Sequence, residues 1–341
     1  MAEIVRELTD LGDGVFAYTQ LPGSWGWSNA GLVIDGDQSL LVDTLFDRKL
    51  TGEMLDRMRR AAPAAARIDR VVNTHGNGDH CYGNGLVADA EIIATRACVD
   101  ELRDAPPGRN ATLLRAARAL AALGPAAGVV GRAGGALGLR QLEWLVDAAP
   151  FALPLFGAFE FAGNEVTLPN RTFEGTLTLR VGDKTVRVVE VGPAHTRGDA
   201  FVHVVDDRVV FTGDLLFKNA HPIVWAGPVS NWVAALRGLL EEDIETVVPG
   251  HGPVTDRAGI QETIDYLELL TAEARARYDA GLSLDDAVKD IRLDAWRGWL
   301  DAERVYVNVR TLYREFAGEE DAEADILELF AKMARYRDGR L

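Results

Sequence analysis

Hydrophobic and polar positions along much of the chain fall into short runs that predict β-strands. Runs of this length, rich in branched apolar residues and broken by glycine and aspartate, are typical of strands with one or both faces buried. They occur at residues 15–19, 30–34, 39–42, 70–74, 91–95, 176–181, 184–191, 200–205, 208–212 and 246–249. Apolar residues at helical spacing predict helices at 47–62 and 231–241, between these strands.

Two further segments are predicted to be helical throughout. Residues 99–161 are rich in alanine, leucine, glycine and arginine, and predict two or three helices that interrupt the β-rich pattern. This insert is either a packing cap or a lid over a substrate, since long inserts in a compact domain are often functional. After residue 255 the pattern predicts helices at 260–280, 284–291, 301–316 and 322–336. Two β-rich halves flanked by helices predict an α/β protein with sheets packed between helical layers.

Composition and charge narrow the classes of partner. Of the 341 residues, 48% are hydrophobic and 26% are charged, which is typical of a globular protein. With 36 basic and 52 acidic side chains the net charge is −16, so we expect neither nucleic acid nor a membrane as a partner. Cys81 and Cys98 cannot make a disulfide framework, and no signal peptide or membrane span is visible. We therefore expect a cytoplasmic protein that acts on a small molecule.

Histidine and aspartate residues gather on loops that follow predicted strands. One such loop holds two imidazoles and a carboxylate within six residues, in the sequence His-Gly-Asn-Gly-Asp-His, and its glycines let neighbouring side chains converge. Other loops that follow predicted strands hold His195, Asp214 and His251. Imidazoles with carboxylates in this setting predict a metal site, and suit zinc or iron.

The order of these loops resembles the metallo-β-lactamase fold superfamily, which includes glyoxalase II and lactonase-like hydrolases. The family signature is a His-x-His-x-Asp-His loop, then a distant His, an Asp and a final His, each after a strand. The resemblance covers residues 14–255 apart from the insert, and Asp43 looks like an early buried aspartate of the family. It implies a four-layer αββα sandwich with a catalytic domain at 1–255. Residues 256–341 would then be a helical extension.

The resemblance also implies two adjacent metal positions. The first would be held by His75, Asn77 and His195, the second by Asp79, His80 and His251, with Asp214 bridging both. One or two zinc ions there would polarise the substrate and lower the pKa of a bound water toward about 7. Asp79 and Asp214 would be the catalytic carboxylates.

Asn77 departs from the family signature, which has its second histidine at this place. An amide oxygen is a weaker zinc ligand than imidazole, so we expect the second position to be tight and the first to be weak or empty. Two other interpretations remain: Asn77 tunes the site for another metal or hydrogen-bonds the substrate, or the fold persists without activity. The last is disfavoured because the other six ligand positions hold competent residues.

Three functions are compatible with this pattern. The leading prediction is a metal-dependent hydrolase that uses metal-bound hydroxide on an ester, lactone, thioester or amide of a small hydrophobic molecule. An iron-dependent redox enzyme of the oxygenase or dioxygenase type on the same fold is the first alternative. The second is a catalytically weakened metal-binding or interaction protein, which could form a homodimer through the helical extension.

Five residues are candidates for binding substrate, each with a plain packing role as the alternative. Trp25 and Trp27 lie in a glycine-rich turn that overhangs the metals in related folds. His221 follows the bridging Asp214 on the same loop. Phe156 and Phe159 belong to the insert, which we expect to roof the metal cleft, because it is too apolar to be left in water.

Overall fold

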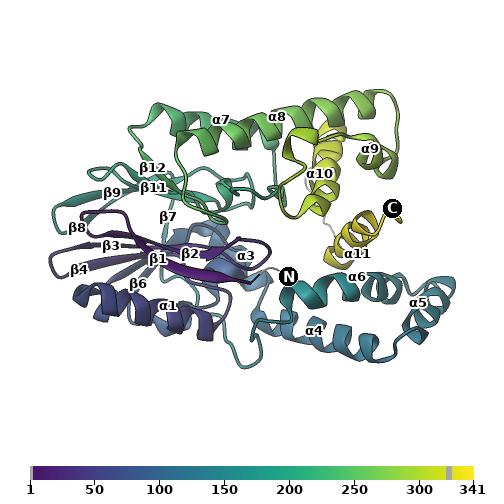
Figure 1. Ribbon diagram of the computed structural model, residues 1–341, viewed down its shortest axis with the longest axis horizontal. Coiled ribbons are helices and arrows are strands. Elements are labelled where there is room, and N and C mark those ends of the chain that lie inside the picture. Colours follow the sequence, from purple (N-terminus) through teal and green to yellow (C-terminus); the bar gives the residue numbers. More distant parts are fainter. Residues whose placement is uncertain (1–2, 320–324) are drawn as a thin grey trace.

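Two β-sheets packed face to face lie between layers of helices in the computed structural model, which describes residues 3–319 and 325–341 (Figure 1). This is the α/β fold that the sequence predicts, a four-layer αββα sandwich with a helical insertion and a helical C-terminal region. Within these described residues no single helix is long and apolar enough to cross a bilayer. Among the same residues, the pair Arg96–Ala122 and Ala126–Ala136, bent by 113°, is long and apolar enough when the two segments are taken together.

The first sheet has seven strands in the order of the sequence. They are β1 Val5–Asp10, β2 Val15–Leu21, β3 Ala30–Asp35, β4 Gln38–Val42, β5 Arg70–Val72, β6 Glu91–Thr95 and β7 Arg171–Phe173. The strands β1 to β4 pair antiparallel, and β4 to β7 pair parallel. The two edge strands were not predicted: three of the six residues of β1 are charged (Arg6, Glu7 and Asp10), and β7 has only three residues.

The second sheet has five strands in the order β12-β11-β10-β9-β8. They are β8 Thr176–Val181, β9 Lys184–Glu190, β10 Ala200–Val204, β11 Val209–Phe211 and β12 Thr246–Val248. The predicted strands of this half form two hairpins, since β8 pairs with β9 and β10 with β11, antiparallel in each case. The last strand, β12, joins β11 in parallel after a crossover through a helix.

Three hydrophobic clusters hold the layers together. One lies between the sheets and contains inward-facing valines such as Val42, Val188 and Val202. The helices α1 Arg48–Ala61 and α3 Arg96–Asp104 cover the outer face of the first sheet. The helices α7 Val229–Glu241 and α8 Arg257–Asp279 cover the second sheet. The side chain of Asp47 caps α1 by accepting a hydrogen bond from the Leu50 amide at 2.8 Å, which fixes where this helix begins.

The insert and the C-terminal region meet beside the sandwich (Figure 1). The insert contains α4 Pro107–Ala122, α5 Ala126–Ala136 and α6 Arg140–Phe156, and the C-terminal region adds α9 Leu284–Asp290, α10 Val305–Ala317 and α11 Ile326–Arg337. Short helical turns are α2 Gly78–Cys81 and the 3-10 segments Pro63–Ala66, Asn84–Leu86, Gly213–Leu215, Asp294–Trp296 and Ala302–Arg304. The predicted helix 322–336 starts with residues 322–324, which lie outside the described residues, and α11 forms its remainder. The division at 255/256 stays a prediction, and α8 packs on α7 as part of the outer layer.

Candidate metal centre

The predicted ligands come together at one edge of the sandwich. His75 lies on the loop after β5, Asp79 and His80 lie in the short helix α2 that follows, and His195 follows β9. Because β9 and β11 are both antiparallel to β10, and β12 is parallel to β11, the loops after β9, β11 and β12 leave the second sheet at the same edge. Those loops carry His195, Asp214 and His251 in turn. All six side chains are buried.

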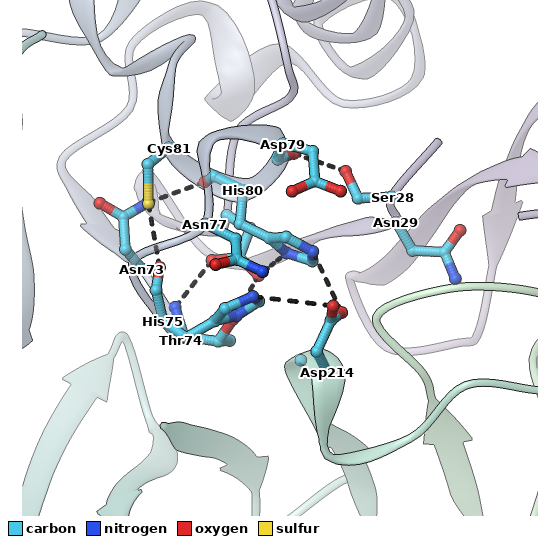
Figure 2. A network of polar contacts seen from close by, with 12 residues as sticks. Ser28, Asn29, Asn73, Thr74, His75, Asn77, Asp79, His80, Cys81 and Asp214 are labelled. Carbon is cyan, nitrogen blue, oxygen red and sulfur yellow. Dashed lines mark hydrogen bonds and ion pairs between the residues drawn. The ribbon is translucent and has the colours of Figure 1, made fainter. Parts of the chain in front are cut away.

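Asp214 is near all four candidate histidines, and Figure 2 shows its carboxylate facing His75 and His80. Its carboxylate oxygens lie 3.1 Å from Nε2 of His80, 3.3 Å from that of His195, 3.4 Å from that of His251 and 3.7 Å from that of His75. A side chain on Gly250 would overlap an oxygen of Asp214, so glycine is needed for this loop to close beneath the carboxylate. Four imidazoles therefore face one buried acid.

The donor set contains two overlapping groups that could hold a metal ion, and both include His80. The ligand atoms of His75, His80 and Asp214 lie within 4.8 Å of one another, as do those of Asp79, His80 and His251. Nε2 of His75, Nε2 of His80 and Oδ1 of Asp214 are buried without a well-aligned hydrogen bond among the described residues, although the last two atoms lie 3.1 Å apart. Buried polar atoms are normally paired, so these three atoms indicate a missing partner such as a cation.

Hydrogen bonds behind the cluster orient two of the imidazoles. His80 donates from Nδ1 to Asp43 at 2.9 Å, and His195 donates from Nδ1 to the Ile223 carbonyl at 2.7 Å. Asp43 also accepts hydrogen bonds from the backbone amide and the hydroxyl of Thr74, both at 2.7 Å. Each Nε2 is thereby left as the atom that faces the cluster, which is the arrangement that second-shell groups give to metal ligands. Asp43 thus has a role consistent with the buried aspartate suggested by the sequence.

Electrostatics divides the four histidines into two pairs. Burial lowers the pKa of His195 to about 4, and burial with the nearby His80 lowers that of His75 well below its usual range. Burial opposes charge on His251 and His80 too, but carboxylates outweigh it. Asp214, with Asp79, raises the pKa of His251 to about 9, and Asp214, with Asp43, raises that of His80 well above the ordinary value. A metal bound here would take the place of the protons on this second pair.

Asn77 lies against His195. Its carboxamide nitrogen is 2.9 Å from Nε2 of His195, and because Nδ1 of that ring already donates to Ile223, Nε2 is the acceptor. The carboxamide therefore occupies the lone pair that a metal in the first position would use.

A cavity of about 440 Å³ adjoins the cluster, and Asn77, Asp79, His195, Asp214 and His251 form part of its wall. The rest of the wall is mostly apolar, and much of it comes from the insert and from α11. It includes Leu113, Leu114, Ala117, Leu145, Ala149, Ile326, Leu327 and Phe330. The insert thus roofs the cleft beside the candidate ligands, as the sequence predicts.

The five predicted substrate contacts divide into two groups. Trp25 and Phe156 line the cavity. Trp27 and Phe159 lie outside its lining and pack on each other in the core of the first sheet, with ring centroids 4.6 Å apart. His221 is outside the lining as well, and its Nδ1 lies 3.1 Å from the hydroxyl of Tyr266. Their buried environments explain these three residues as packing elements.

Several lining residues were missed by the sequence reasoning. Arg304 is buried beneath Trp25, with its guanidinium carbon 4.3 Å from the indole centroid, and it lines the cavity. Phe330 reaches the same wall from α11. Both residues are far in sequence from every loop that carries a candidate ligand. The hydrophobic pattern of a helix does not show which of its faces lines a cavity formed with distant residues. Tyr82 also lines the cavity, and its position directly after the first ligand loop is a signal that sequence reasoning could have used.

The fold and the arrangement of candidate ligands are those of a metallo-beta-lactamase-like protein, and comparison with protein families agrees. The model of the metallo-beta-lactamase superfamily matches residues 23–251, which is most of the chain and includes every candidate ligand. The protein belongs to the metallo-beta-lactamase superfamily.

Individual relatives match the chain at low identity. The acyl-coenzyme A thioesterase MBLAC2 of Bos taurus is 25% identical over 255 residues, which is 71% of this chain and 79% of that protein. The hydroxyacylglutathione hydrolase of Rhizobium etli is 32% identical over 97 residues, 28% of this chain and 38% of that protein. The structure of a double mutant of the sec-alkyl sulfatase PisA1 matches with a TM-score of 0.63 at 13% sequence identity. The match covers 92% of this chain and 50% of the PisA1 chain. This structural match shows a shared fold.

Proposed function

We propose that this protein is a metal-dependent hydrolase that cleaves an acyl thioester or ester with an apolar acyl group. The observation that carries the proposal is the shared wall between the ligand cluster and the cavity. Asp79, Asp214 and His251 form its polar end, and side chains of α4, α6 and α11 form its apolar part. A substrate with a hydrophobic chain and a carbonyl group at one end matches this division of chemistry.

The residues of the cluster would divide the work of hydrolysis. A zinc ion bound by Asp79, His80, His251 and Asp214 would act as a Lewis acid and make water acidic enough to attack at neutral pH. Asp79 lies 3.3 Å from His251, at the edge of the cluster that faces the cavity, where it can accept a proton from the attacking water. Trp25 and Phe156 would hold the acyl chain beside the carboxylates.

Asn77 supports unequal metal positions. Its amide occupies the lone pair of His195 at 2.9 Å, whereas Asp79, His80 and His251 have no such competitor among the described side chains. We therefore propose one tight zinc position, made by the second group with Asp214, and one weak position. Iron also suits imidazole and carboxylate ligands, so the metal is tested by elemental analysis of the purified protein.

The name of the Bos taurus relative supports a thioester as the substrate class. A thioester carries its apolar acyl chain and its leaving group on opposite sides of the scissile carbonyl. The acyl chain can therefore fill the cavity while the leaving group remains toward solvent.

The test is hydrolysis of a matched series of acyl thioesters and oxygen esters of increasing chain length by the zinc-loaded protein. The proposal expects the specificity constant kcat/KM to rise with chain length until the cavity is filled. Asp214→Ala should remove both activity and most of the bound zinc. Equal rates for acetyl and long-chain substrates, or full activity after removal of the metal, would contradict the proposal.

A further inference from the structure

The outer end of the insert exposes apolar side chains that have no covering element in the described structure. Leu123 is 49% exposed, Val129 58%, Leu137 77% and Leu139 55%, and these are four of the six large hydrophobic residues exposed in the described parts of the chain. They lie on the turn after α4, on α5 and on the turn before α6. We refer to these four residues as the insert tip. Figure 1 shows α5 at the end of the insert that is far from the sheets.

The charge of this segment is opposite to that of the whole protein. Residues 105–142 contain five arginines and no lysine, aspartate or glutamate, so they carry +5 while the remainder of the chain carries −21. Arg109, Arg115, Arg118 and Arg140 are exposed, and none of them forms an ion pair with a carboxylate anywhere in residues 3–319 or 325–341. Acidic side chains are common elsewhere on the surface, so these unpaired cations beside exposed leucines are a local feature.

We propose that the insert tip is a docking site for a membrane surface that carries anionic lipids. Exposed leucine and valine side chains can enter the boundary between headgroups and acyl chains, while neighbouring arginines face the phosphates. The charge argues against pairing of two tips in a dimer, since each tip would bring its own unpaired arginines to the contact. The net charge of −16, which argues against a membrane partner, is an average over the whole chain. The acidic residues that cause it lie outside this segment.

The docking site and the cavity use the same helices. Leu113, Leu114 and Ala117 of α4, with Leu145 and Ala149 of α6, line the cavity, and the ends of these helices hold the insert tip. A membrane bound at the tip would thus hold the walls of the cavity close to lipids that carry long acyl chains. This benefit for substrate capture rests on the proposed hydrolase function, but the binding to lipid does not.

The experiment is co-sedimentation of the full chain with vesicles of phosphatidylcholine, with and without 30 mol% phosphatidylserine, at low and at physiological ionic strength, without substrate. The Arg115→Gln/Arg140→Gln variant should bind anionic vesicles at least about tenfold more weakly. The Leu137→Glu/Leu139→Glu variant should lose binding. A matched control, Leu269→Glu/Arg275→Gln, changes the same residue types at exposed positions of α8 and should bind as the unmodified protein does.

Binding that requires phosphatidylserine, weakens with salt and depends on the tip variants alone supports the proposal. Absence of binding to anionic vesicles at low ionic strength overturns it, as does binding that all three variants retain. Sedimentation velocity gives the other decisive outcome: if the tip variants convert a dimer into monomers and no vesicle binding is seen, the tip is an interface between copies. Failure of hydrolysis with intact vesicle binding would instead count against the proposed function alone.

Discussion

Asn77 contacts one imidazole of the candidate metal centre. Its amide is hydrogen-bonded to Nε2 of His195, the ligand that a metal in the first position would need. The sequence identifies this residue as a departure from the family signature, but only the structure shows which atom it contacts.

Replacing Asn77 with histidine should therefore strengthen the first position. The Asn77→His variant removes the competing amide and adds an imidazole donor, so the affinity for a second equivalent of zinc should rise at least about tenfold. Calorimetric titration of the metal-free protein measures this directly. The control is Asn110→His, which adds an imidazole to the same cavity wall at a position outside the candidate ligand groups. If both variants bind zinc alike, Asn77 does not control the first position.

His221 should make the protein less stable in mild acid. Burial and the nearby Arg304 lower its pKa to about 4, below the ordinary value of 6.5. Between these two values the unfolded chain binds a proton that the folded chain does not, so the free energy of unfolding falls as the pH falls through this window. When the pH is lowered from 7.5 to 5, the free energy of unfolding of the His221→Gln variant should therefore fall by about 2 kcal/mol less than that of the unmodified protein. Denaturant titrations at the two pH values measure this difference. Parallel pH profiles for the two proteins would show that His221 does not contribute.

Individual elements divide into those that hold the ligands and those that shape the cavity. The ligands depend on loops of the two sheets, whereas the apolar wall depends on the insert and on α11, which packs against α6. Two phenylalanines of the insert, Phe156 and Phe159, show the difference. The former lines the cavity, and the latter is 4% exposed and packs against Trp27 and Phe46.

Truncating the two rings should have opposite consequences. Phe156→Ala should raise KM for long-chain substrates by roughly tenfold or more, because it removes apolar surface from the cavity wall, and should leave the zinc content unchanged. Phe159→Ala should leave KM nearly unchanged but lower the free energy of unfolding by about 3–5 kcal/mol, since it empties a packed core site. Steady-state kinetics and denaturant titration of both variants provide the comparison. Equal changes in KM would contradict the assignment of the cavity wall.

Ion pairs attach α11 to the insert. Arg335 contacts Glu143 at 2.9 Å and donates from Nε to Asp147 at 2.8 Å, so one guanidinium bridges two acids of α6. Arg335→Gln should speed hydrogen exchange of α11 amides and leave the strands unaffected, because the ion pairs hold a single element. The stability cost should be small, about 1 kcal/mol, since the group is partly exposed. Arg275→Gln, at an exposed pair within α8, is the control, and unchanged exchange in α11 would contradict this role.

For the whole molecule, the sequence predicts the sandwich and the ligands better than the cavity. Strand patterns and ligand loops are local signals, so β2 to β6, β8 to β12 and the six converging ligands follow from short stretches of residues. The wall of the cavity depends on long-range packing between residues 107–156 and residues 326–337, which have no shared local pattern. Trp27 was predicted as a substrate contact from the loop of related folds, Phe159 from the apolar insert and His221 from its place after Asp214. All three lie outside the lining of the cavity. The overall composition also does not show the positive charge of residues 105–142, because the rest of the chain dominates the net charge of −16.

The central claim is that hydrolysis depends on one tight metal position at the edge of the sandwich. The most direct test measures the rate of hydrolysis of a long-chain acyl thioester as zinc is added back to the metal-free protein. The account predicts no activity without zinc and a plateau at about one equivalent per chain. The absence of activity at every zinc concentration would contradict the claim. So would activity that continues to rise until a second equivalent of zinc has been added.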